Sequence, residues 1–185
     1  NHDKPLGVLT GFPRIDECLL GMRPGQMIVI GARPGVGKTS FALNLMTNAA
    51  FNGASVAMFS LEMSKVEIAQ RLLAANARVG LQEIRSARIR NEQWPQILQA
   101  TNDLSQLDIM IDDTPGTTVT EIRAKARRIL RGKPLGLVII DYLQLISPPS
   151  GGHRADSRAT EVSEMSRGIK IMAKDLGVPV VALSQ

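Results

Sequence analysis

A short glycine-rich segment between a predicted strand and a predicted helix constrains the fold of this chain most. Residues 32–39 read Ala-Arg-Pro-Gly-Val-Gly-Lys-Thr, after an aliphatic strand predicted at Gln26–Ile30 and before a helical pattern that begins at Lys38. Glycines let consecutive backbone N–H groups turn toward one anion, and the helix N-terminus adds a partial positive charge. The segment departs from the strict G-x-x-x-x-G-K-[ST] pattern only at its first position, Ala32. It predicts a phosphate-binding loop (P-loop) in an α/β fold.

The residue types around this loop predict how a nucleoside triphosphate is held. At this spacing Lys38 reaches the β- and γ-phosphates, and the Thr39 hydroxyl ligates Mg²⁺. A second strand, predicted at Leu137–Asp141, ends in a carboxylate that completes the Mg²⁺ site at the same edge of a parallel sheet. Each motif has an alternative interpretation when it is considered alone. Residues 32–39 could be a simple turn before a helix, and Asp141 could be a residue that caps the next turn. The candidate nucleotide-binding residues are Arg33, Gly35, Gly37, Lys38, Thr39 and Ser40, and the candidate metal ligands are Thr39 and Asp141.

Glu62 is the candidate catalytic residue, because it lies just past the strand predicted at Ser55–Ser60, at the same edge of the sheet as the P-loop. A carboxylate at that edge of the sheet can polarise the water that attacks the γ-phosphate. The next residues, from Ser64 to Glu67, have the spacing of a helix capping box, and a Glu before a helix also interacts favourably with the helix dipole. From spacing alone, both interpretations of Glu62 remain open.

Short aliphatic runs alternate with helical patterns along the rest of the chain, which favours a mostly parallel central sheet with helices on both faces. A long polar loop is expected at Ser147–Thr160, and its Arg154 and Arg158 are candidate DNA-phosphate contacts. The remaining predicted elements are helices at Lys38–Ala50, Ser64–Asn76, Asn91–Gln106 and Thr118–Arg131, a helix with an apolar face from Val162 to Leu176, and strands at Asp108–Asp112 and Val178–Ser184.

Composition excludes several classes of protein. The chain has 185 residues, enough for one compact domain, and its apolar runs are far shorter than a membrane span needs. A net charge of +5 is compatible with a polyanionic partner, whereas 3% aromatic residues argue against base reading by stacking. The single cysteine, Cys18, cannot form an internal disulfide, which fits a reducing compartment.

Four motifs occur in a fixed order: residues 32–39, Ser60-Leu61-Glu62-Met63, Asp141-Tyr142-Leu143-Gln144-Leu145 and Ala182-Leu183-Ser184-Gln185. Together they resemble the C-terminal motor domain of bacterial replicative DNA helicases of the DnaB type, which has a RecA-like fold. The resemblance covers nearly the whole chain. It implies that residues 1–185 are a RecA-like ATPase domain belonging to a larger helicase, truncated at the C-terminal end, with the N-terminal domain and final strands absent.

The resemblance also implies residue roles that spacing does not establish. Glu62 matches the catalytic glutamate of the family, and Asp141 matches its Walker B carboxylate. Arg71 resembles an arginine that contacts bound nucleotide. Gln185 resembles the glutamine that senses the γ-phosphate and relays its state toward DNA, and is placed with Lys38 and Glu62 among the candidate catalytic residues.

The function implied by the resemblance is ATP-dependent unwinding of DNA at the replication fork. Mg²⁺–ATP hydrolysis would drive movement on single-stranded DNA by a homo-hexamer in the bacterial cytoplasm, with primase and a helicase loader as partners in the primosome. The arginine finger and the main DNA-binding loop are expected beyond Gln185, so we expect weak ATPase activity from the isolated chain. The alternatives are another RecA-like ATPase, such as a recombinase or a plasmid or phage replication protein, and a nucleotide-gated assembly module that scarcely hydrolyses ATP.

Overall fold

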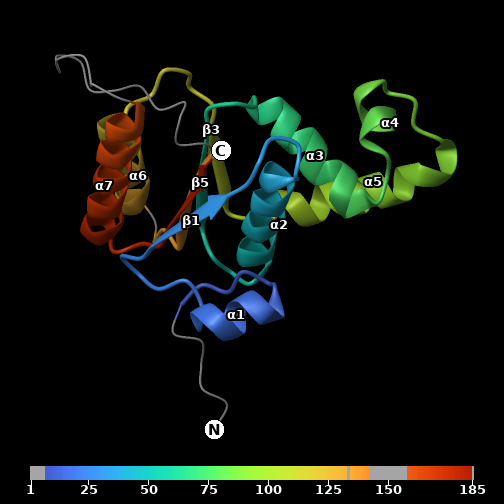
Figure 1. The fold of residues 1–185 in the computed structure, drawn as a ribbon. Coiled ribbons are helices and arrows are strands. Elements are labelled where there is room, and N and C mark those ends of the chain that lie inside the picture. Colours follow the sequence, from blue (N-terminus) through green and yellow to red (C-terminus); the bar gives the residue numbers. More distant parts are fainter. Residues whose placement is uncertain (1–6, 133, 142–157, 185) are drawn as a thin grey trace, which may run out of the picture.

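A parallel β-sheet forms the centre of the protein (Figure 1). The computed structural model describes residues 7–132, 134–141 and 158–184, without the side chains of residues 158–161. Within them the sheet has five strands in the order β1-β5-β4-β2-β3, and each neighbouring pair is parallel. The carboxyl ends of all five strands therefore lie at one edge. The strands are β1 (Met27–Gly31), β2 (Val56–Ser60), β3 (Ile109–Asp112), β4 (Leu137–Asp141) and β5 (Val180–Ser184).

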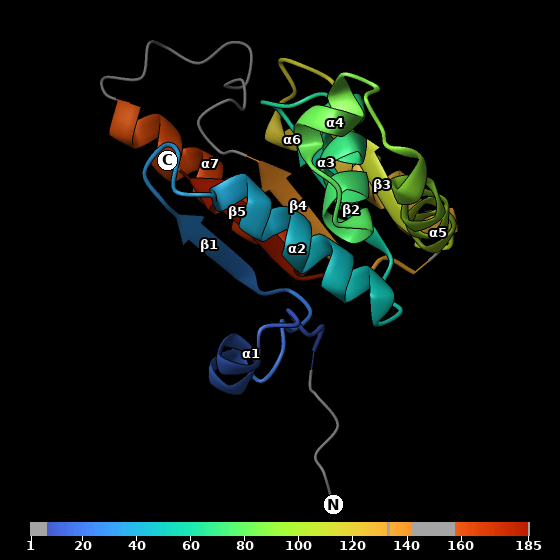
Figure 2. The ribbon, with the colours of Figure 1, turned by 90° about the vertical axis from the view of Figure 1, so that its right-hand side faces the viewer.

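Helices cover both faces of the sheet, as expected. Helices α2 (Lys38–Phe51) and α3 (Lys65–Ala77) pack on one face, and α6 (Val119–Gly132) and α7 (Arg158–Leu176) pack on the other (Figure 2). The central strand β4 is buried throughout, and its residues alternate between the two hydrophobic clusters. This period of two is the reason why a strand buried on both faces reads as a continuous aliphatic run.

A small helical group extends beyond the β3 side of the sheet. It consists of α4 (Leu81–Arg85), a 3₁₀ turn η1 (Asn91–Gln93) and α5 (Trp94–Ser105). Residues of α4 and α5 pack with α3 around a separate apolar cluster. A further short helix, α1 (Pro13–Leu19), precedes β1. The segment before it packs on α2, where Phe12 stacks on Phe41 and the Thr10 carbonyl accepts from the Asn48 side chain at 3.1 Å. No sequence pattern predicted α1 or α4, because seven and five residues are too few to display a helical stripe.

Most predicted elements are confirmed, with boundary differences that have local causes. The predicted helix at Asn91–Gln106 is divided into η1 and α5 at Pro95, which lacks a backbone N–H. The last strand begins at Val180 instead of Val178, directly after Pro179. Helix α7 begins at Arg158, inside the loop predicted at Ser147–Thr160, because its first turn contributes no residue to the apolar stripe that marks the rest.

The capping box predicted at the start of α3 forms, and a second capping box begins α6. The Ser64 hydroxyl accepts from the Glu67 amide at 3.2 Å, and the Glu67 carboxylate accepts from the Ser64 amide at 3.2 Å. Thr118 and Glu121 repeat this exchange at the start of α6.

Among the described residues, no helix is both long enough and apolar enough to span a bilayer.

Candidate nucleotide-binding site

The candidate residues gather at the carboxyl edge of the sheet. Ser60 at the end of β2 pairs in register with Asp141 at the end of β4, and Gly31 at the end of β1 pairs with Ser184. The P-loop leaves β1 beside β5, where the Ala32 amide donates to the Ser184 carbonyl at 3.3 Å. Ligands of open α/β sheets bind at this edge.

Two glycines give the P-loop its shape. Gly35 and Gly37 have φ angles of 79° and 97°, which residues with a Cβ atom rarely adopt. No atom lies within 4 Å of the position of an added Cβ at either residue, so the requirement for glycine comes from the backbone and not from crowding. Gly37 is the N-cap of α2, no side chain caps that helix in the described structure, and its first turn carries no acidic residue. The positive end of α2 is therefore available to an anion.

The predicted metal ligands lie in direct contact. The Thr39 hydroxyl donates to Oδ2 of Asp141 at 3.0 Å, although the two residues are 102 positions apart. Asp141 is fully buried, and its Oδ1 atom accepts no hydrogen bond from any described residue. Burial raises the pKa of Asp141, against the opposing effects of the Thr39 hydrogen bond and the Lys38 charge.

These donors fit Mg²⁺. A buried carboxylate oxygen without a partner, next to a threonine hydroxyl, supplies hard oxygen ligands, and Mg²⁺ commonly takes only one or two protein ligands together with phosphates and water. In the described part of the chain, no three His, Cys, Asp or Glu side chains gather as a larger metal cage would require. The geometry agrees with a shared metal and nucleotide site, whereas the role of each ligand stays a prediction.

Lys38 and Glu62 complete the group of charges. Lys38 is buried, with 9% of its surface exposed, and its positive charge lowers the pKa of Asp141. Glu62 is exposed in the turn between β2 and α3, and its negative charge raises the pKa of Asp141. Both charges therefore act on Asp141 at the carboxyl edge of the sheet.

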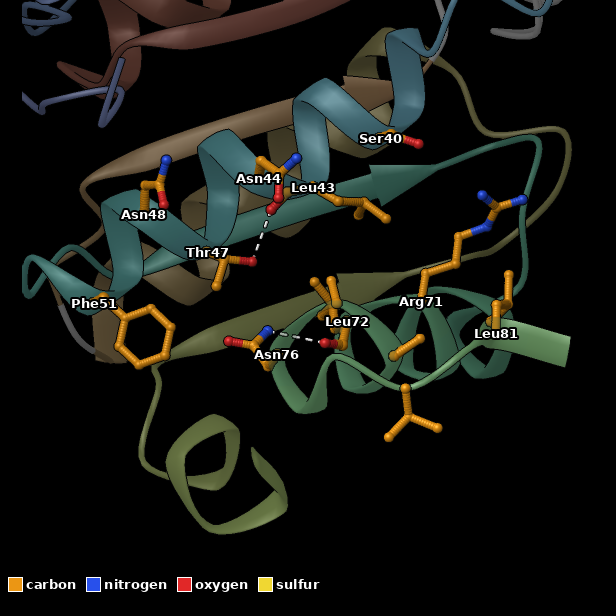
Figure 3. A pocket seen from close by; sticks show the side chains of 13 residues that line it. Ser40, Leu43, Asn44, Thr47, Asn48, Phe51, Arg71, Leu72, Asn76 and Leu81 are labelled. Carbon is orange, nitrogen blue, oxygen red and sulfur yellow. Dashed lines mark hydrogen bonds between the residues drawn. The ribbon is translucent and has the colours of Figure 1, made fainter. Parts of the chain in front are cut away.

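A cavity of about 440 Å³ lies between α2 and α3 (Figure 3), and Ser40, the residue after Thr39, is among those that line it. Ser40 and Arg71 line it toward one end of α2, and Phe51 lies toward the other end. The Nε atom of Arg71 is buried without a hydrogen-bond partner in the described structure. Arg33, in contrast, is exposed in the P-loop.

Three candidate positions cannot be placed. Gln185 and Arg154 lie outside the described residues, and Arg158 is described only as the first backbone position of α7.

The sequence did not predict the hydrogen bonds that connect the turn containing Glu62 to neighbouring elements. The Leu61 amide donates to the Asp141 carbonyl at 2.7 Å, and the Lys65 amide donates to Oδ2 of Asp113 at 2.9 Å. No motif marks these contacts, because they depend on the order of the strands.

The fold and the site together define an α/β P-loop nucleotide-binding domain. The chain belongs to a particular family of this class, the DnaB-like helicase C-terminal domain, whose family model matches residues 7–185. The resemblance noted from the motifs is therefore confirmed.

Curated relatives agree with this assignment. The chain is 45% identical over 180 residues to the replicative DNA helicase DnaC of Bacillus subtilis and 43% identical over 180 residues to the replicative DNA helicase DnaB of Geobacillus stearothermophilus. Each alignment covers 97% of this chain and 39% of the relative. The chain thus spans well under half the length of these relatives.

Solved structures confirm the RecA-like fold. A solved structure described as an ATPase domain matches with a TM-score of 0.92 and 37% identity, covering all of this chain and 66% of that one. A DnaB-like replicative helicase, described together with its interactions with primase, matches with a TM-score of 0.91 and 37% identity, covering all of this chain and 44% of that one.

Proposed function

We propose that this chain is the ATP-hydrolysing motor of a replicative DNA helicase, which couples Mg²⁺–ATP hydrolysis to movement on single-stranded DNA and to duplex unwinding. Family membership and the names of the curated relatives support this function. The observation that carries it is the contact between Thr39 and Asp141 beside Lys38, at the end of a helix whose N-terminus has no side-chain cap.

In this proposal the chain binds and orients the nucleotide before it contributes to the reaction. The P-loop amides, the N-terminus of α2 and Lys38 hold the β- and γ-phosphates and stabilise charge on the transferring phosphoryl group. Thr39 and Asp141 would hold a Mg²⁺ ion, which when bound would neutralise charge on the phosphate oxygens. Glu62 orients the attacking water and accepts its proton, and Arg71 contacts the nucleotide from the cavity side.

The partners in this proposal are those of a replicative helicase in the bacterial cytoplasm. We infer a homo-hexamer around single-stranded DNA, with an arginine finger from the neighbouring subunit and with primase and a loader as further partners. The related helicase whose structure is described with its primase interactions supports the primase contact. Gln185 would relay the state of the γ-phosphate, and Arg154 and Arg158 would contact DNA.

Family membership disfavours the recombinase alternative. A nucleotide-gated assembly module would need no acidic residue near the γ-phosphate, so the position of Glu62 beside the charges of Asp141 and Lys38 favours hydrolysis.

The nucleotide assignment is tested by Lys38→Ala in the full-length protein. Removing a charged phosphate contact from a buried site is expected to weaken ATP binding by about 10- to 100-fold and to abolish DNA unwinding at ATP concentrations that saturate the parent enzyme. Titration of a fluorescent ATP analogue measures the affinity. Lys170→Ala, which removes an exposed lysine on α7, is the matched control and should bind like the parent. Parent-like affinity of Lys38→Ala would contradict the P-loop assignment.

A further inference from the structure

One buried hydroxyl at the carboxyl edge has no role in the proposed site. Ser60 is the last residue of β2 and pairs in register with Asp141, and only 1% of its surface is exposed. A hydroxyl in this position must satisfy its hydrogen bonds within the protein. The hydrogen-bond partners of the Ser60 hydroxyl therefore identify the part of the backbone that it restrains.

Both hydrogen bonds of Ser60 go to one residue. Its Oγ atom donates to the Met63 carbonyl at 2.7 Å and accepts from the Met63 amide at 3.3 Å. The hydroxyl thus closes a turn that contains only Leu61 and Glu62. The Leu61 amide in turn donates to the Asp141 carbonyl at 2.7 Å, so the closed turn is attached to the strand that carries the predicted metal ligand.

The Ser60 bonds restrain the part of the turn that the contacts at the start of α3 do not reach. On the helix side, the capping box of Ser64 and Glu67 fixes the start of α3, and the Lys65 amide is bound by Asp113. These contacts all begin after Met63. Within the described residues, the side chain of Ser60 is the one that bonds to the backbone between β2 and this cap.

The side chain of Glu62 depends on that backbone for its direction. Glu62 is exposed, and the described structure shows no hydrogen bond to its carboxylate, so packing does not fix where it points. Its Cα position and its φ and ψ angles set the position from which the carboxylate reaches a water molecule. A misplacement of about 1 Å in such a group can reduce a reaction rate by about 100-fold.

We propose that Ser60 is a positioning residue for hydrolysis: its hydroxyl holds the 60–63 turn so that the Glu62 carboxylate meets the attacking water. This inference rests on the proposed catalytic role of Glu62. It assigns no contact between Ser60 and the nucleotide. Loss of the hydroxyl should therefore slow the chemical step and leave ATP binding unchanged.

A second hydroxyl in the same fold provides a matched comparison. Thr117 is also buried, with 3% of its surface exposed, and its Oγ1 atom donates to the Thr114 carbonyl at 2.7 Å. It closes a turn of the same size after β3, where no predicted catalytic residue lies. Thr117→Val should lose similar turn stability without changing hydrolysis.

The experiment compares Ser60→Ala, Thr117→Val, Glu62→Gln and the double variant Ser60→Ala/Glu62→Gln in the full-length helicase. We expect Ser60→Ala to lower kcat by about 10- to 100-fold while KM for ATP and the affinity for a non-hydrolysable analogue stay within about two-fold of the parent. Thr117→Val should keep the parent kcat. Ser60→Cys, which retains a weaker donor, should lie between the parent and Ser60→Ala, and it provides the test if Ser60→Ala does not fold.

Single-turnover rates of the double variant show whether Ser60 acts through Glu62. If it does, Ser60→Ala has little further effect once Glu62 is replaced. An equal loss in both backgrounds would overturn the inference, as would parent-like kcat in Ser60→Ala, or an equal loss in Thr117→Val. Parent-like turnover of Glu62→Gln would instead refute the catalytic role of Glu62, a result independent of the Ser60 single variant.

Discussion

Two helices begin at the same edge of the sheet, and their N-termini are built in opposite ways. The N-cap of helix α2 is Gly37, which has a φ of 97° and makes no side-chain cap, and the first helical residue is Lys38. The N-cap of helix α3 is Ser64, which forms a complete capping box with Glu67 in the first turn. The first N-terminus leaves its amides to a ligand, whereas the second is satisfied within the chain.

The two helix ends therefore serve different purposes: the N-terminus of α2 binds phosphate, and the N-terminus of α3 helps to position the Glu62 turn. An open, positively charged helix end stabilises phosphate. A capped helix end gains stability without a ligand, and here it supports the Glu62 turn together with Ser60 and Asp113. Changes at the open N-terminus of α2 should therefore alter nucleotide affinity, and changes in the turn before the capped N-terminus of α3 should alter the rate of hydrolysis.

The largest effect is expected on the α3 side from Glu62→Gln. Removal of a general base typically lowers a rate by about 10²- to 10⁴-fold. ATP affinity should remain near the parent value, because the open end of α2 is unchanged. Steady-state ATPase assays with the full-length protein and analogue titrations measure the two quantities. Glu17→Gln, an exposed change in α1, is the control, and a loss of affinity equal to the loss of kcat would break the proposed separation.

A smaller effect is expected on the α2 side from Gly37→Ala. A Cβ in the left-handed region costs about 1–2 kcal/mol, although no atom obstructs it here. If the loop changes conformation to relieve this strain, ATP affinity should fall by about 10-fold, with kcat less affected. Analogue titration checks the affinity.

Gly53→Ala sharpens that test. Gly53 has a φ of 89° and the same open surroundings, but it follows the end of α2, away from the P-loop. It should lower the unfolding free energy by a similar amount and leave affinity unchanged. Equal loss of affinity in both variants would show that global stability, and not the loop, controls binding.

Both helix ends could be predicted from the sequence. The P-loop was found because its glycines and Lys38 are consecutive residues with a local geometric purpose. The Ser64 capping box was found for the same reason. Asp141 could be joined to Thr39 only by assuming the order of the strands, which the structure then shows as β1-β5-β4-β2-β3.

Contacts between elements were not predictable from local patterns. Ser60 looks like the end of an ordinary buried strand, and Asp113 looks like a turn residue after β3. Their partners depend on how β2 lies between β3 and β4 and on the path of the chain into α3. The same limit explains why α1 and α4 were missed, since each is stabilised by neighbours rather than by its own pattern.

The smallest effect concerns Asp141, which lies between the two helix ends. Its pKa is raised mainly by burial, so in the nucleotide-free protein its ionised form destabilises the fold. Asp141→Asn keeps an acceptor for Thr39 and removes the buried charge. We expect the Tm of the nucleotide-free variant to rise by about 2–4 °C at neutral pH, the shift that corresponds to about 1 kcal/mol for a domain of this size.

The pH dependence of this effect has a definite sign. Above the folded-state pKa, the carboxylate is ionised in both the folded and unfolded states, and the cost of burying its charge is complete. As pH falls through the raised folded-state pKa, the native carboxyl takes up a proton and the cost disappears, so the Tm difference between parent and variant should shrink. Saturating Mg²⁺–ATP should reverse the order of the two proteins, because the bound metal compensates the charge of Asp141. A variant that gains stability equally with and without Mg²⁺–ATP would show that this carboxylate does not face the metal.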